Sequence, residues 1–157
     1  MFLISHRGNI NGINHDKENS PLYIDEALNS GFDVEIDVRC LNKINSSTFL
    51  LGHDEGQYEV ELDWFRKRNK NLWIHAKNLE ALSFFSKQET KYNVFWHQDD
   101  EYTLTNKGYI WAYPGSRLDC NSVCVLPEKA NYSKKDLQQC AGICSDVITT
   151  YNKIKND

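Results

Sequence analysis

The sequence lacks a long hydrophobic run, a basic tract and the pattern of a secretory leader. Its longest apolar runs cover about five residues, far short of the ~20 that a membrane-spanning helix needs, so we expect no transmembrane segment. The first apolar run turns polar at Ser5-His6-Arg7, unlike a signal peptide, and we expect a cytoplasmic protein. The formal net charge is −4 and the basic residues form no cluster, so we expect no nucleic-acid partner.

Internal repeats, low-complexity tracts and interdomain linkers are also missing from the sequence. The 157 residues are enough to build one hydrophobic core. Hydrophobic residues make up 40% of the chain and charged residues 25%, which is ordinary for a globular protein. We therefore expect a single domain over residues 1–157. The oligomeric state stays open.

The five cysteines do not follow the C-x-x-C spacing that is common in zinc-binding motifs. Four of them form two similar pairs, Cys120-x-x-x-Cys124 and Cys140-x-x-x-Cys144. Cys124 and Cys144 lie inside apolar runs, which favours reduced cysteines that pack in the core. A metal site or a disulfide is the alternative.

Short apolar runs alternate with amphipathic stretches along the chain. The runs predict strands at 2–5, 32–41, 48–52, 72–76, 94–96, 109–113, 123–126 and 142–146. The amphipathic stretches predict helices at 21–28, 62–68, 79–87, 134–139 and 147–155, and a turn is expected at 42–47. This alternation favours an α/β protein with a parallel sheet covered by helices. Both a closed barrel and an open sheet fit the pattern.

Ionisable side chains alternate with apolar ones in two of the predicted strands. Glu35 and Asp37 fall on one face of their strand, and His75 and Lys77 fall on one face of theirs, because residues i and i+2 of a strand point the same way. Paired ionisable groups near strand ends are costly to bury without a use. A cation held between the two carboxylates would supply that use. A solvated face of an edge strand is the alternative for Glu35 and Asp37.

Histidines follow two further apolar runs. His6-Arg7-Gly8 closes the first run of the chain, and His53-Asp54 closes the run that ends at Leu51. The carboxyl ends of parallel strands carry the active site in α/β barrels, so residues in these positions are candidates for catalysis. For His53-Asp54 taken alone, a turn at a strand end is the favoured explanation.

Together these motifs resemble those of the glycerophosphodiester phosphodiesterase family, in the wider group of barrel phosphodiesterases. The family pattern reads H-R-G, E-N-[ST], E-x-D-V, H-D, [ED]-x-K and a final T-D-like pair. The matching residues are His6-Arg7-Gly8, Glu18-Asn19-Ser20, Glu35-Ile36-Asp37-Val38, His53-Asp54, His75-Ala76-Lys77 and Ser145-Asp146. This chain departs from the pattern in two ways: the segment after H-D is shortened to 55–63, and His75 stands where the family has a carboxylate.

The resemblance implies a compact TIM-type (β/α) barrel with shortened helices and loops, since the chain is shorter than the ~250 residues usual for that fold. It implies metal-dependent hydrolysis of a small glycerophosphodiester to an alcohol and glycerol phosphate. His6 and His53 would then serve as the acid and the base, and Arg7 and Lys77 would bind the phosphate of the substrate. For Glu18-Asn19 we expect helix capping and loop ordering at least as much as catalysis.

For the metal, the resemblance implies one divalent cation, Mg²⁺, Ca²⁺ or Mn²⁺, held by Glu35, Asp37 and the residue at position 75. Calcium and magnesium prefer oxygen ligands, whereas an imidazole such as that of His75 suits manganese, iron or zinc better. His75 could instead bind the phosphate as a cation, or pack at the mouth of the barrel.

Several aromatic and polar residues have open assignments. We expect Trp96, Trp111 and Tyr113 to pack in the core, although one of them could form an apolar wall for the alcohol of the substrate. His97 either lines the mouth of the site or is a structural histidine. Asp146 could close the mouth by hydrogen bonding.

Two other functions remain open. The same site could act on a lysophospholipid or sphingolipid headgroup, which would require an exposed apolar loop that the sequence does not indicate. Alternatively, the chain could be a degenerate barrel that binds a phosphorylated ligand or a protein partner without turnover.

Overall fold

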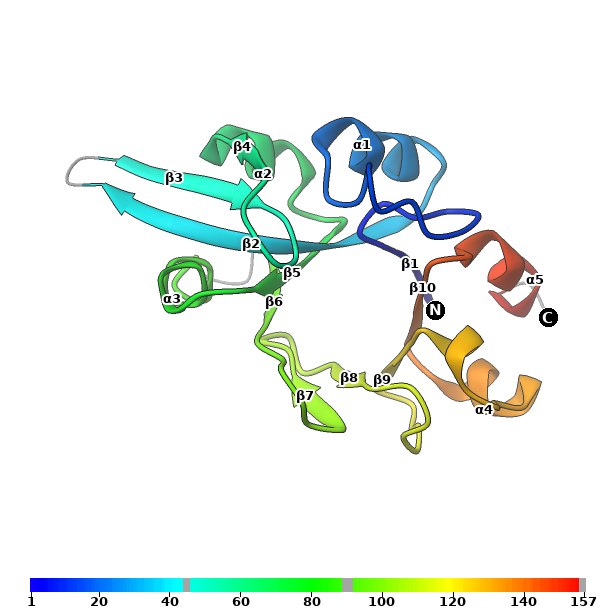
Figure 1. Cartoon of the computed structure of the whole chain (residues 1–157). Helices are drawn as coiled ribbons and strands as arrows, with labels where there is room; N and C mark the ends of the chain where they lie inside the picture. The colour runs from blue at the N-terminus through cyan, green and yellow to red at the C-terminus, as the bar shows by residue number, and fades with distance from the viewer. Residues whose placement is uncertain (44–45, 89–91, 156–157) are drawn as a thin grey trace.

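The computed structural model describes residues 1–43, 46–88 and 92–155, in which strands and helices alternate along the chain (Figure 1). The strands are β1 (Phe2–His6), β2 (Asp33–Lys43), β3 (Ser46–Leu51), β4 (Tyr58–Val60), β5 (Leu72–Ala76), β6 (Asn93–Phe95), β7 (Tyr102–Leu104), β8 (Ile110–Ala112), β9 (Ser122–Val125) and β10 (Gly142–Ser145). The helices are α1 (Pro21–Asn29), α2 (Leu62–Arg68), α3 (Leu79–Ser86), α4 (Lys134–Gln139) and α5 (Asn152–Lys155). Two 3₁₀ helices, η1 (Pro127–Lys129) and η2 (Ile148–Tyr151), complete the described elements.

Local sequence signals explain where the helices begin and end. The Ser20 hydroxyl accepts a hydrogen bond from the Tyr23 amide at the start of α1. Gly31 follows this helix with a φ of 87°, a conformation that glycine adopts without strain. The Asn78 side chain caps α3 in the same way, by accepting from the amide of Ala81 at 3.0 Å. These capping interactions agree with the helix positions expected from the sequence.

The ten strands form one mostly parallel sheet in the described residues. Parallel ladders join β6 to β5, β5 to β2, β2 to β1, β1 to β10, β10 to β9 and β9 to β8. Antiparallel ladders join β7 to β8, and β3 to both β2 and β4. The parallel strands follow one another around a curve in Figure 1, and the β2–β3 hairpin projects from it. The predicted α/β class with a mostly parallel sheet is therefore confirmed.

The sheet is not closed, because no ladder joins β6 to β8 in the part of the chain that the structure describes. Side chains and turns connect the two strands instead. The Asn106 amide donates to the Val94 carbonyl at 2.9 Å, and the Val94 amide donates to the side-chain oxygen of Asn106 at 2.8 Å. The rings of Phe95 and Trp111 stack with their centroids 4.4 Å apart. The two edges of the curved sheet thus lie in contact without a shared backbone ladder.

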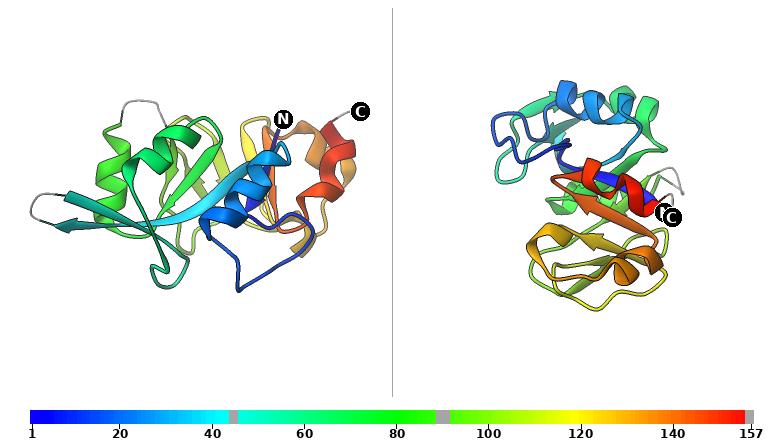
Figure 2. Two further views of the ribbon diagram at one scale, coloured as in Figure 1. Left: turned by 90° about the horizontal axis from the view of Figure 1, so that it is seen from above. Right: turned by 90° about the vertical axis from the view of Figure 1, so that its right-hand side faces the viewer.

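Apolar residues pack against both faces of the sheet. On the outer face, Val34, Ile36 and Val38 of β2 pack with residues of α1, α2 and α3. A second cluster lies under α4 and η2 and includes Ile143. On the inner face, side chains from different strands pack against each other without a helix: Ile4, Trp73, Phe95, Trp111, Val123, Val125 and Cys144. Figure 2 shows the helices on the outside of the curved sheet.

Some details of the sequence interpretation were wrong. The short strands β4 and β7 were not predicted, and the predicted helix at 147–155 is a 3₁₀ turn, η2, followed by the single turn of α5. Part of the turn expected at 42–47 belongs to strands, because β2 reaches Lys43 and β3 begins at Ser46; residues 44–45 lie outside the described residues. All five cysteines are free thiols, and only Cys120 is exposed. None of the helices in the described ranges combines the length and apolar character needed to span a bilayer.

Candidate active site

The candidate site lies at the carboxyl ends of the parallel strands. On several strands, an apolar residue of the inner cluster is followed two positions later by a residue that lines one cavity. These pairs are Ile4 and His6, Trp73 and His75, Phe95 and His97, Trp111 and Tyr113, and Cys144 and Asp146. The inner apolar layer therefore lies beneath a more polar cavity of about 420 Å³, a volume within the range of small-molecule sites.

Histidines are concentrated at this cavity. The chain contains five histidines, and all five line it: His6, His15, His53, His75 and His97. They come from five separate segments of the sequence, so the chain fold and not a local sequence cluster brings them together. An imidazole can bind a metal ion or take part in proton transfer, so this gathering of histidines makes the cavity a candidate site.

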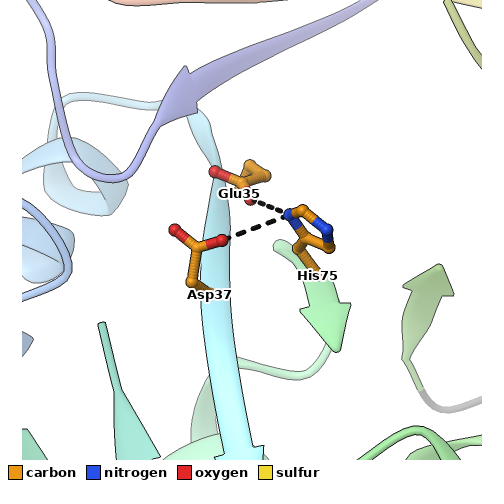
Figure 3. A group of neighbouring side chains, drawn as sticks. All are labelled: Glu35, Asp37 and His75. Carbon is orange, nitrogen blue, oxygen red and sulfur yellow. Dashed lines mark ion pairs between the residues drawn. The ribbon is translucent and has the colours of Figure 1, made fainter. Parts of the chain in front are cut away.

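Glu35, Asp37 and His75 form the most buried polar cluster of the site (Figure 3). Both carboxylates project from β2, and the imidazole faces them from the adjacent strand β5, where Asp37 is paired with His75. The His75 Nδ1 atom lies 3.2 Å from Asp37 Oδ1 and 3.6 Å from Glu35 Oε1. One potential ligand atom from each residue lies within 4.8 Å of the others, a spacing that suits a single metal ion.

The orientation of His75 is set from the opposite side of its ring. Its Nε2 atom lies 2.9 Å from the backbone carbonyl of His97, so Nε2 carries a proton and donates it. Nδ1 is left facing the carboxylates. Burial lowers the pKa of His75, but the hydrogen bonds and negative charges of Asp37 and Glu35 outweigh that effect and raise the pKa to about 9. In the cation-free protein at neutral pH, His75 is therefore charged and partly neutralises the two carboxylates.

Asp37 is fully buried and has the densest set of polar partners. The Asn19 side chain donates to Asp37 Oδ2 at 3.0 Å and accepts from the Asp37 amide at 2.9 Å. Arg7 Nε lies 3.1 Å from Asp37 Oδ2, and Lys77 Nζ lies 3.9 Å from Asp37 Oδ1. Although burial raises the pKa of Asp37, the hydrogen bond from His75 and the charge of Arg7 hold it well below its usual range. Asp37 is thus a carboxylate at any pH near neutral.

Two buried carboxylate oxygens of this cluster have few donors. Glu35 Oε2 accepts no hydrogen bond in the described residues, and its ion-pair partner His6 Nε2 lies 3.9 Å away. In the same part of the chain, Asp37 Oδ1 has the charged Nδ1 of His75 at 3.2 Å and Lys77 Nζ at 3.9 Å. Buried anionic oxygens with too few donors are costly. A divalent cation would compensate for both, and the set of two carboxylates and one imidazole is a suitable donor set for manganese or another first-row metal.

His6 is held by a buried acidic network on the other side of the cavity. Its Nδ1 atom lies 2.7 Å from Asp146 Oδ1, which also accepts from the Asn9 side chain at 2.9 Å. Because a carboxylate only accepts, Nδ1 carries a proton and Nε2 faces Glu35. Burial lowers the pKa of His6, but the hydrogen bond to Asp146 and the charge of Glu35 raise it overall. Asp146 thus forms hydrogen bonds at the cavity, and its closing of a barrel mouth stays a prediction.

His53 has a different environment. It lies after β3, its side chain is 40% exposed, and its Nδ1 atom lies 2.6 Å from the carboxylate of Asp54, which is itself 91% exposed. It lines the main cavity and also an adjoining one of about 540 Å³ that Asp54, Glu55 and Gln57 border. The polar partner of His53 therefore belongs to its own loop and is exposed to solvent.

One wall of the main cavity is aromatic and apolar. Trp111 is buried, as expected, whereas Tyr113 is 51% exposed, so the expectation that it packs in the core was wrong. The ring of His97 stacks on Tyr113, with centroids 5.5 Å apart. Ile13, from the loop between β1 and α1, lines the same cavity and is 49% exposed.

Most of the residues predicted from the sequence as functional lie at this cavity. Six line it and the seventh, Asp37, contacts three of them; the six are His6, Arg7, Glu35, His53, His75 and Lys77. The structure brings these side chains together, and their roles stay predictions. Sequence reasoning missed Asn9, which joins Glu18 to Asp146, because no pattern marks it. It also missed Arg39, which the alternation Glu35, Asp37, Arg39 on one strand face could have revealed.

Comparison of the chain with protein-family models, with curated proteins and with solved structures found no match. The geometry of the cavity is therefore the basis on which a function can be inferred.

Proposed function

We propose that the protein is a metal-dependent phosphodiesterase of the glycerophosphodiester phosphodiesterase type. The observation that supports this most is the meeting, at one cavity, of a Glu35–Asp37–His75 cluster, two histidines suited to proton transfer and two cationic side chains. Cleavage of a phosphodiester needs charge neutralisation on the non-bridging oxygens, a proton acceptor and a proton donor. The cavity offers side chains for each requirement.

Glu35, Asp37 and His75 would hold the divalent cation. A cation bound there would offset the negative charge of the non-bridging phosphate oxygens. In the cation-free protein, the proton on His75 Nδ1 partly neutralises the two carboxylates. A metal ion that binds through Nδ1 would displace that proton. The nitrogen ligand leads us to propose manganese ahead of magnesium or calcium.

His6 and His53 would carry out proton transfer, one accepting a proton from the attacking group and the other donating one to the leaving oxygen. For His6, the hydrogen bond from Nδ1 to Asp146 leaves Nε2 available on the side of the cavity. His53 approaches the same cavity from the loop after β3. A positioned acid or base of this kind contributes ~10²–10⁴-fold in rate.

Arg7 and Lys77 would contact the phosphate of the substrate. Both line the cavity and both are anchored to Asp37, with 18% and 17% of their side chains exposed. Arg7 has a φ of 55°, an uncommon conformation for a residue with a side chain, which directs its guanidinium toward Asp37 and Glu18. Held in this way, the two cations would lose little side-chain entropy on binding an anion.

We also propose that the curved sheet is a shortened barrel of the TIM type. Support comes from the inner apolar cluster, which is built from strands at both edges of the sheet, and from the contacts between β6 and β8. The position of the cavity at the carboxyl ends of the parallel strands is the one that active sites occupy in such barrels.

The substrate would be a small glycerophosphodiester, because a cavity of about 420 Å³ accommodates a molecule of that size. One observation favours the lysophospholipid alternative. Ile13 and Tyr113 are about half exposed at the rim of the cavity, where an acyl chain or a lipid surface could contact them. The loop between β1 and α1 thus offers one half-exposed apolar side chain, Ile13, toward the apolar surface that this alternative requires.

A panel of diesters tests the proposal. Glycerophosphocholine, glycerophosphoethanolamine, lysophosphatidylcholine and bis-(p-nitrophenyl) phosphate would each be assayed with and without added Mn²⁺, Mg²⁺ or Ca²⁺. Cation-dependent hydrolysis of the glycerol esters supports the proposal, and preferential cleavage of lysophosphatidylcholine supports the lipid alternative. Cation-dependent binding of the diesters without any hydrolysis would identify a non-catalytic phosphate-binding protein and reject the enzyme.

A further inference from the structure

Arg39 makes an unusual set of contacts next to the site. It follows Asp37 by two residues on β2, so it continues the strand face that carries the acidic cluster. Its guanidinium donates hydrogen bonds to the carbonyls of three consecutive residues: to Gly52 at 2.5 Å, to His53 at 2.8 Å and to Asp54 at 2.8 Å. In the described residues it forms no ion pair with a carboxylate. Its charge is directed at the backbone of one loop.

That loop is a tight turn, and Arg39 binds it from the neighbouring strand β2. The Gly52 amide donates to the Asp37 carbonyl at 3.1 Å, and the Gln57 amide donates to the Leu51 carbonyl at 2.8 Å, so backbone bonds hold the two ends. Gly52 has a φ of 146°, and a Cβ at this position would lie 2.0 Å from the Glu55 carbonyl oxygen. The loop therefore folds back closely on itself, and Arg39 holds the carbonyls in its middle.

The position of the His53 side chain depends on the backbone of its loop more than the position of the His6 side chain depends on its own backbone. The side chain of His6 is 13% exposed and is fixed by Asp146, whose side chain is 5% exposed. The side chain of His53 is 40% exposed, and its polar partner, Asp54, belongs to the same loop and is solvated. Among the ion pairs of the described residues, His53 has no buried acidic partner of the kind that His6 has in Asp146, so its location depends on the path of the backbone.

We infer that Arg39 is a positioning residue that holds His53 at the cavity by binding the backbone of its loop. The effect of Arg39 on hydrolysis rests on the proposed function, whereas its effect on the position of His53 does not. Arginine suits the task because its planar fork can serve several acceptors at once, and charge-assisted hydrogen bonds are about twice as strong as neutral ones. A lysine at this position would present a single ammonium and could not reach the three carbonyls with the same geometry.

The first arm of the test needs no activity. Protein labelled at its histidine rings would be compared by NMR with the variants Arg39→Gln and Arg39→Lys, and with Arg66→Gln, a matched loss of an exposed arginine on α2. We expect the His53 ring signal to shift or broaden in both Arg39 variants, less in Arg39→Lys, while the His6 signal stays unchanged. An unchanged His53 signal would overturn the inference. If Arg39→Gln fails to fold, Arg39→Lys decides by the same criterion.

The second arm measures kinetics with a hydrolysed diester. We expect Arg39→Gln to lose on the order of 10²-fold in kcat, a loss typical of a displaced catalytic group. KM and Mn²⁺ affinity should stay near parent values, and Arg66→Gln should behave like the parent. A parent-like kcat, or a loss confined to KM or to cation affinity, would overturn the positioning role. If the parent hydrolyses no diester, the proposed function fails, and the NMR arm alone decides whether Arg39 positions His53.

Discussion

Replacement of His75 by glutamine should remove a pH-dependent part of the stability of the cation-free protein. His75 donates toward two buried carboxylates, Glu35 and Asp37, and its pKa is raised from 6.5 to about 9. One pKa unit corresponds to ~1.36 kcal/mol of differential interaction, so the raised pKa corresponds to about 3 kcal/mol of stability. The same interaction lowers the pKa of Asp37, so the two shifts describe one contribution and are counted once.

The sign follows from the direction of the shift. Because the pKa of His75 is higher in the folded protein, its contribution is fully present below pH 6.5 and is lost as the pH rises through about 9. The parent should therefore lose up to about 3 kcal/mol of unfolding free energy across this window. His75→Gln lacks this contribution, so the difference between the two proteins should be largest near pH 6 and small above pH 9. About 3 kcal/mol is the upper value, since a buried carboxylate of the variant can take up a proton.

The assay is urea denaturation with a chelator present, at several values between pH 6 and pH 9.5. The pKa of His6 is also raised, but this group is present in both proteins and largely cancels in the difference. His15→Gln is the control, because the His15 side chain is 82% exposed, and it should follow the parent. A difference between parent and His75→Gln that is the same at pH 6 and at pH 9.5 would refute the reasoning.

Three further predictions concern the same cavity. His75→Glu should shift the metal preference from manganese toward magnesium or calcium, and identical activity profiles across metals in the two proteins would exclude His75 as a ligand. His6→Ala and His53→Ala should each lose ~10²–10⁴-fold in hydrolysis rate with folding intact by circular dichroism, and near-normal activity in either would remove that residue from the mechanism. Asn19→Ala breaks two hydrogen bonds to the buried Asp37 and should cost ~1–3 kcal/mol in urea denaturation; an unchanged midpoint would show that water replaces both.

The sequence predicted the regular elements well where a local signal marks them. The bounds of α2 and β5 agree with the structure, and the Ser20 and Asn78 caps lie where expected. The strand β7 was missed because it is three residues long and two of them are exposed, so no apolar run identifies it. The two edges of a curved sheet meet through contacts between distant segments, such as Phe95 with Trp111. The alternation of apolar and polar residues along one strand does not predict such contacts.

Strand periodicity predicted which side chains of the site share a strand face, but not the partners that hold them in place. The two-residue repeat places Glu35 and Asp37 on one face, and the structure has them there beside His75. The partners that position these groups are not local. Asn19 binds Asp37 from a backbone conformation with a φ of 62°, and Asp146 reaches His6 across 140 residues of sequence. Such contacts exist only because parallel strands bring their carboxyl ends together.

The central claim is that Glu35, Asp37 and His75 hold the cation on which diester hydrolysis depends. The most direct measurement is the initial rate of hydrolysis of one diester against Mn²⁺ concentration, after chelation, for the parent and for Asp37→Asn, which keeps the size of the side chain and removes its charge. The account predicts no activity in the chelated parent, a saturable return with Mn²⁺, and no return in Asp37→Asn. Activity that survives chelation, a parent-like Mn²⁺ dependence in Asp37→Asn, or no hydrolysis at any cation concentration would contradict it.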